Sequence, residues 1–173
     1  MMKQFGAVIS LICILQLSVA CSEDSSSKNA LVGKWKLTSW SAEVPMDLNN
    51  DGLANVNLLK ETTCSNKETL SFDVHGIVSS EDTFNPMVMF SEVNGGGANA
   101  YVVQVECAEG IIGFAMDYAY DRANGTVQMG ENTVATLNGG ELTIIYGNAI
   151  EIYNTELTEV VATKDLTKVY TKQ

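Results

Sequence analysis

Arginine, histidine and proline are scarce in this chain of 173 residues. It contains one histidine (His75), one arginine (Arg122) and two prolines. It has ten basic and 21 acidic residues, which gives a formal net charge of −11. A protein that binds nucleic acid or an anionic membrane surface needs a basic patch, so this composition predicts neither kind of partner. An acidic surface instead keeps a protein soluble and attracts cations.

The motifs of common enzyme classes are also absent. The sequence has no Gly-x-Ser-x-Gly element, no His-Glu-x-x-His and no phosphate-cradling glycine loop. His75 stands alone before Gly76, so a hairpin position explains it better than catalysis does. Paired carboxylates for glycoside hydrolysis stay open, because only their separation in space would reveal them. We therefore predict a non-enzymatic protein, with a hydrolase as the least favoured alternative.

A long apolar run occurs only at the N-terminus. A short positive start with Lys3 precedes the run from Phe5 to Val19, which ends in small residues and Cys21. This layout is typical of a secretory signal peptide. The segment from Leu17 to Cys21 resembles the lipobox of bacterial lipoproteins, although Ser18 stands where leucine is usual. We expect residues 1–20 to be removed and Cys21 to carry a lipid anchor. The alternative is an ordinary signal peptide with an incidental cysteine.

The segment after Cys21 is short, polar and acidic. The stretch from Ser22 to Ser27 has the composition of a flexible linker, so residues 21–29 are expected to form the anchor and a tether. Acidic residues behind a lipidated cysteine also resemble the surface-export tag of some Gram-negative lipoproteins. The expected location is the outer membrane, facing the periplasm or the cell surface. Residues 30–173 then form one domain.

Cysteine is too infrequent for a disulfide-rich scaffold. Cys13 would leave with the leader and Cys21 would carry lipid, so Cys64 and Cys107 remain. In an oxidising compartment these two are expected to form one disulfide, and two free thiols are the alternative. No cluster of cysteine and histidine accompanies them, so a zinc site is not expected.

Apolar and polar residues alternate with a period of two along most of the chain after Leu31. Leu70, Phe72 and Val74 are one example, and such alternation is typical of half-buried strands. Glycine- and asparagine-rich turns separate the segments. The predicted strands span residues 32–41, 67–74, 76–81, 87–93, 99–108, 111–121, 125–129, 132–138, 141–147, 149–154, 158–163 and 166–171.

Many short strands with few prolines favour a closed barrel over a sandwich, because closure removes exposed strand edges. We predict an all-β fold, an antiparallel up-and-down β-barrel. The first long connection, residues 41–66, differs in character. Residues 55–61 could form one short helix there, with Val56 and Leu59 facing the barrel.

Several segments occur in the order typical of bacterial lipocalin-like lipoproteins. Leu31 to Ser39 resembles their opening strand, and Gly33-x-Trp35 matches the Gly-x-Trp element of lipocalins. The Asp-x-Asn-x-Asp-Gly segment with a following cysteine, the hairpin from Leu70 to Gly76 and the closing strand from Leu166 to Lys172 are also similar. The resemblance implies a lipocalin-like barrel that binds a small apolar molecule.

In this family Gly33 and Trp35 would close one end of the barrel, with the indole as a plug. Lipocalins pack a late arginine over that indole, and the late strands of this chain offer Lys168 as a substitute. An eight-stranded barrel can hold one ligand or be filled by side chains. The ligand-binding residues stay unassigned. The methionines that could line a pocket or belong to the core are Met87, Met89, Met116 and Met129. The alternative function is a non-catalytic structural or protein-interaction module of the cell envelope.

The strongest local chemical motif begins at Asp47. Oxygen-bearing side chains at alternate positions, followed by Gly52, match the first half of a calcium loop. The glutamate expected at the twelfth position is replaced by Leu58. Asn55 and Glu61 lie nearby and could complete a site. The candidate ligands are Asp47, Asn49, Asp51 and the carbonyl of Leu53. Calcium is thus the one candidate cofactor that the sequence suggests, and an ion-free Asx turn is the alternative.

Overall fold

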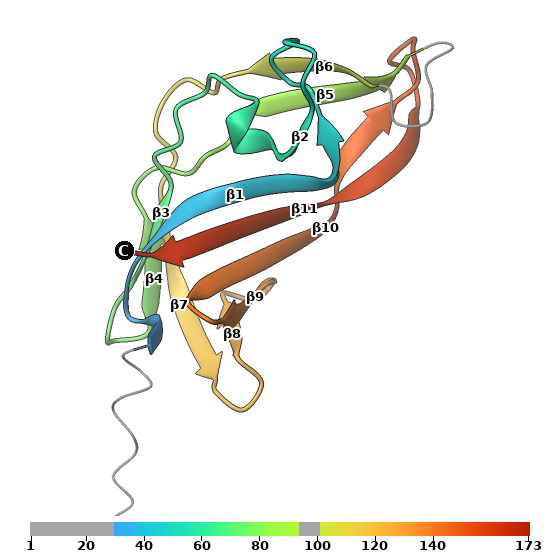
Figure 1. The fold of residues 1–173 in the computed structure, drawn as a ribbon. Coiled ribbons are helices and arrows are strands. Elements are labelled where there is room, and N and C mark those ends of the chain that lie inside the picture. The colour runs from blue at the N-terminus through green and yellow to red at the C-terminus, as the bar shows by residue number, and fades with distance from the viewer. Residues whose placement is uncertain (1–29, 94–100) are drawn as a thin grey trace, which may run out of the picture.

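A computed structural model describes residues 30–93 and 101–173 (Figure 1). The strands are β1 (Gly33–Met46), β2 (Asn55–Asn57), β3 (Thr69–Phe72), β4 (Ile77–Ser80), β5 (Met87–Glu92), β6 (Tyr101–Glu106), β7 (Phe114–Asp121), β8 (Thr126–Met129), β9 (Thr133–Asn138), β10 (Glu141–Tyr153) and β11 (Val160–Lys172). One 3-10 helix, η1 (Leu58–Lys60), follows β2. Among the described residues no helix has the length and apolar character needed to cross a membrane. The predicted leader, the lipid anchor at Cys21 and the tether lie outside the described residues.

Eight of the strands form a closed antiparallel barrel. Their order around the ring is β1, β3, β4, β7, β8, β9, β10 and β11, and β11 returns to pair with β1. Apart from β2 and the inserted β5–β6 hairpin, which lie outside the ring, each of these strands pairs with the next one along the chain, so the connectivity is up-and-down. The predicted all-β, up-and-down barrel is confirmed.

The strands β10 and β11 extend well beyond the barrel. Each is a single strand of 13 residues, where the sequence pattern predicted two shorter ones. The pairing of β10 with β11 shifts register between Tyr146 and Ile150, which interrupts the two-residue alternation at the point where the prediction divided β10. Beyond this shift, β10 pairs in parallel with β5 at Ile152 and Phe90. The β5–β6 hairpin is thereby attached beside one end of the barrel (Figure 1).

The first long connection contains less helix than expected. The segment from Asn55 to Asn57 is extended and pairs with β1, and the helix is the single turn η1. Because β2 is extended, Val56 points away from the core and is 45% exposed, so its predicted contact with the barrel is wrong. Leu58 is fully buried in its place, and Leu59 packs partly against the core.

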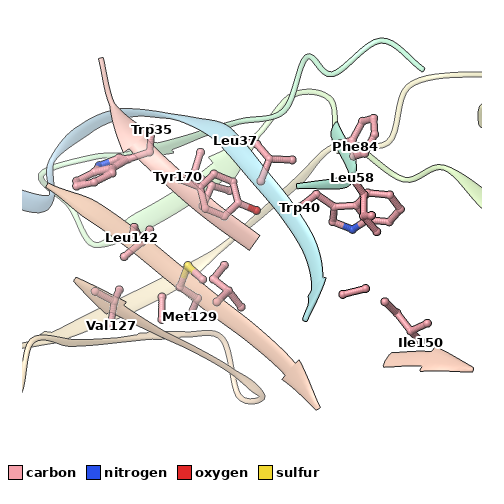
Figure 2. Close-up of a cluster of buried hydrophobic side chains, with 14 of the residues drawn as sticks. Trp35, Leu37, Trp40, Leu58, Phe84, Val127, Met129, Leu142, Ile150 and Tyr170 are labelled. Atoms are coloured by element: carbon pink, nitrogen blue, oxygen red, sulfur yellow. The ribbon is translucent and has the colours of Figure 1, made fainter. Parts of the chain in front are cut away.

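The hydrophobic core fills one end of the barrel with side chains. Trp35 is 1% exposed, and its Nε1 donates a hydrogen bond to the carbonyl oxygen of Leu31 at 2.7 Å. These side chains belong to one continuous core cluster. Figure 2 shows Trp35 on one side of it and Trp40, Leu58 and Phe84 on the other, with Leu37 and Tyr170 between them.

Candidate functional site

A pocket of about 850 Å³ lies between the end of the barrel and the β5–β6 hairpin. This volume falls within the range of about 300–1,000 Å³ that is usual for small-molecule sites. Its apolar lining includes Trp40, Phe84, Met87, Val88, Met89, Phe90, Ile150 and Leu166. Of the four methionines named from the sequence, Met87 and Met89 therefore line the pocket, whereas Met129 is buried in the core and Met116 packs against it.

Two irregularities in strand pairing shape this pocket. The pairing of β1 with β11 shifts register between Leu37 and Ser39, so that Trp40, rather than its neighbour, becomes the next buried side chain of β1. Trp40 then meets Phe84 edge to face, with ring centroids 5.5 Å apart. The shift in β10 after Tyr146 lies in the segment that contributes Asn148 and Ala149 to the pocket lining. Bulges bend strands and re-aim their side chains, and both of these lie next to residues that line the pocket.

A buried ion pair lies beside the pocket. Glu68 precedes β3 and is 2% exposed. Its Oε2 accepts hydrogen bonds from Lys168 Nζ and from the backbone N–H of Phe84, both at 2.8 Å. The hydroxyl of Tyr170 donates to Oε1, and Lys168 Nζ also donates to the carbonyl oxygen of Phe84 at 3.3 Å. A carboxylate is stable in such a buried place only when it is paired and hydrogen-bonded in this way.

The phenols near this pair stay protonated. Burial, and then the negative charge of Glu68, raise the pKa of Tyr170 far above its usual range. The same two causes, in the same order, raise the pKa of Tyr146. Lys168 and Tyr146 both line the pocket, which therefore combines apolar walls with an ammonium group and a neutral hydroxyl.

The predicted role of Lys168 at the closed end is wrong. Lys168 is held by Glu68, and the cation near the indole is Lys172, whose Nζ lies 5.7 Å from the ring centroid of Trp35. Lys172 Nζ also donates to the carbonyl oxygen of Ala30 at 2.7 Å. A Cβ on Gly33, which has φ of +128°, would lie 3.3 Å from Lys172 Cε. Glycine at this position therefore allows both the positive φ and the close approach of the Lys172 side chain to β1.

The predicted disulfide between Cys64 and Cys107 is present, with an S–S distance of 2.08 Å. Cys64 lies in the connection between η1 and β3, and Cys107 directly follows β6. The bond therefore ties the β5–β6 hairpin, which forms one wall of the pocket, to the connection that precedes β3.

The calcium-like motif forms a tight loop between β1 and β2. Asp47 Oδ2 accepts a hydrogen bond from Gly52 N at 2.8 Å, and Asp51 Oδ1 accepts one from Leu53 N at 2.7 Å. Glu61, the C-cap residue of η1, approaches this loop. One carboxylate oxygen from each of Asp47, Asp51 and Glu61 lies within 4.8 Å of the other two. The sequence suggested Glu61 only by its nearness, because it lies beyond Leu58, the position where a standard calcium loop has its glutamate.

His75 occupies the turn between β3 and β4, as its position before a glycine predicted. It is exposed, and its backbone N–H donates to Asp73 Oδ1 at 2.9 Å. The N–H of Ile77 donates to the same oxygen at 2.8 Å. These hydrogen bonds, that from Ile77 foremost, lower the pKa of Asp73. The carboxylate of Asp73 thus holds the turn through two backbone hydrogen bonds.

Comparisons with protein-family models, with curated proteins and with solved structures found no match for this chain. The resemblance to lipocalin-like lipoproteins therefore rests on the sequence motifs and on the barrel fold.

Proposed function

We propose that this protein is a lipoprotein of the bacterial cell envelope, anchored through Cys21, whose lipocalin-like barrel binds a small apolar molecule. The observation that carries the proposal is the pocket at the end of the barrel, with its walls of aromatic, aliphatic and methionine side chains. Met87 is 66% exposed at this pocket, although it is apolar and flexible. Exposed methionines of this kind suit a surface that adapts to a ligand.

The polar groups of the pocket favour a neutral ligand. The charge of Lys168 is already balanced by Glu68, and Glu106 and Glu151 also line the pocket. A carboxylate on the ligand would therefore meet little net attraction. An ammonium group has three N–H donors, and Lys168 donates to Glu68 and to the carbonyl oxygen of Phe84. A hydroxyl or carbonyl oxygen on an otherwise apolar molecule is the best match.

Binding of a neutral fluorescent naphthylamine probe tests this proposal. The variant Ala149→Trp would fill the pocket, because Ala149 lines it. The matched control Val134→Trp adds the same side chain at an exposed position of β9. We expect saturable binding by the native chain, a loss of affinity on the order of tenfold or more in Ala149→Trp, and unchanged binding in the control. Equal binding by both variants would contradict a pocket-bound ligand.

Anchoring is tested separately by labelling cells with a clickable fatty acid. We expect label on the native chain and none on the Cys21→Ser variant, which should leave the membrane fraction. Label that persists in the variant would contradict lipidation at Cys21.

The second candidate function is a structural or protein-interaction module. Apolar side chains exposed on the outside of the barrel favour it, among them Val134 and Ile145. These two are aligned on neighbouring strands, since the adjacent pair Ala135 and Ile144 is in register. Interaction surfaces usually present larger continuous patches, so the pocket supports ligand binding more strongly. Absence of any probe binding by the native chain would favour this second function.

A further inference from the structure

The loop between β1 and β2 gathers oxygen atoms around one point. Both carboxylate oxygens of Asp47 accept backbone hydrogen bonds, from Asp51 N at 3.1 Å and from Gly52 N at 2.8 Å. Asn50 and Gly52 have positive φ values of 59° and 86°, which give the loop its sharp turn. These contacts hold the carboxylates of Asp47 and Asp51 in place before any ligand arrives.

Glu61 is the unusual member of this group. Its side chain is only 5% exposed, and among the described residues its Oε2 is the buried side-chain atom without a hydrogen-bond partner. A buried carboxylate oxygen without a partner is unfavourable, because the protein does not replace the water that it loses. Burial, followed by the charges of Asp51 and Asp47, raises the pKa of Glu61. Three carboxyl groups thus lie together, and one of them is buried with an oxygen that has no hydrogen-bond partner.

We propose that Asp47, Asp51 and Glu61 form a calcium-binding site. Calcium takes six to eight oxygen ligands at about 2.3–2.6 Å, so two oxygens on one ion are separated by at most about 5.2 Å. One carboxylate oxygen from each of the three residues lies within 4.8 Å of the other two, which meets this condition. Asn49 and the carbonyl of Leu53 are in the same loop and can supply further oxygen ligands.

Glu61 takes the place of the glutamate that closes a standard calcium loop. The residue at the expected position, Leu58, is buried in the core and cannot serve. The turn of η1 instead brings Glu61 back to the loop, and its N–H donates to the carbonyl oxygen of Leu58 at 3.1 Å. The ion would thus connect the loop to the segment that carries Leu58, which lies near Trp40 and Phe84 in Figure 2. This inference is independent of the proposed apolar ligand.

Thermal unfolding of the full-length chain tests the site. Melting temperatures are measured in chelator and in increasing calcium chloride, for the native chain, Glu61→Gln and the control Glu131→Gln. Glu131 is exposed in the β8–β9 turn, and neither β8 nor β9 pairs with β1 or β2. We expect calcium to raise the melting temperature of the native chain and of the control, with an affinity near the 10⁻⁴ to about 10⁻³ M typical of extracellular sites.

The Glu61→Gln variant gives the decisive comparison. Without metal it should melt at or above the native temperature, because it loses a buried, repelled charge. In calcium it should melt below the native chain, and calorimetric titration should show affinity reduced on the order of tenfold or more. The proposal is overturned by the absence of a calcium-dependent shift up to roughly ten millimolar, by an equal shift in Glu61→Gln, or by an equal shift with magnesium, which would indicate general charge screening.

Discussion

Removal of the disulfide should loosen the β5–β6 hairpin before it unfolds the barrel. Cys64 and Cys107 are separated by 43 residues along the chain, and the loop that they close contains β3 to β6. In the chain-entropy treatment, a cross-link over this length destabilises the unfolded state by about 4 kcal/mol at 25 °C. The double variant Cys64→Ala/Cys107→Ala should therefore lose about that much stability, and its melting temperature should fall on the order of 10 °C.

The loss should not be uniform, because the hairpin has few other attachments. Its strand pairing with the remainder of the sheet consists of the short parallel contact of β5 with β10, at Ile152–Phe90 and Tyr153–Ser91. The barrel strands, by contrast, form a closed ring. We expect amide hydrogens of β5 and β6 to lose exchange protection first, while those of β1 and β11 keep most of theirs.

Urea unfolding gives the free energy, and hydrogen exchange read by mass spectrometry gives its distribution along the chain. Native protein treated with a reductant is the control, and it should match the double variant in both measurements. A stability loss below about 1 kcal/mol would contradict the loop-closure reasoning. Equal loss of protection in β1 and β5 would contradict the view that the bond mainly restrains the hairpin.

Two further predictions concern the turn at Asp73 and the buried indole. The pKa of Asp73 is lowered in the folded state, first by the hydrogen bond from Ile77 N. The carboxylate therefore stabilises the fold at pH values above its ordinary pKa of about 3.9, and this stabilisation is lost as the pH falls below that value and through the lowered pKa of the folded state. Asp73→Asn should lower the melting temperature at pH 7, and circular dichroism should show the difference shrinking in acid; a difference constant with pH would refute this assignment. Trp35→Ala should cost about 3–5 kcal/mol in urea unfolding, because it removes a fully buried side chain. Trp35→Phe should cost about 1–3 kcal/mol, because it leaves the carbonyl oxygen of Leu31 without its hydrogen-bond donor. A loss of stability below about 1 kcal/mol in both variants would contradict a buried, hydrogen-bonded indole.

The alternation of apolar residues was sufficient to predict the barrel strands. Leu70 and Phe72 on β3, and Leu142 and Ile144 on β10, alternate as expected and point into the core. This works because side chains in a strand point alternately to the two faces, and only one face of a barrel wall is buried. Prediction failed at Val56, where local helix character gave way to pairing of β2 with β1.

The pocket could not be predicted from the same pattern. It depends on register shifts in β1 and β10 and on a hairpin that pairs with β10 from a distant part of the sequence. The partner of Lys168 was missed for a similar reason, since Glu68 lies 100 residues away and its charge meets the ammonium only when the barrel closes. Contacts between residues so far apart along the chain cannot be read from the spacing of neighbouring residues in the sequence.

The sequence by itself was sufficient to predict the all-β barrel, the pairing of Cys64 with Cys107 and the loop that begins at Asp47. These features follow from alternation, from the number of cysteines and from the turn chemistry of neighbouring residues, all of which act over short distances or by elimination. Only the tertiary structure decided that Lys172, and not Lys168, lies over Trp35, and that Glu61 joins Asp47 and Asp51. The physical reason is that the burial of a side chain and the charges around it depend on which segments come together in space. Closure of the barrel brings these distant segments together.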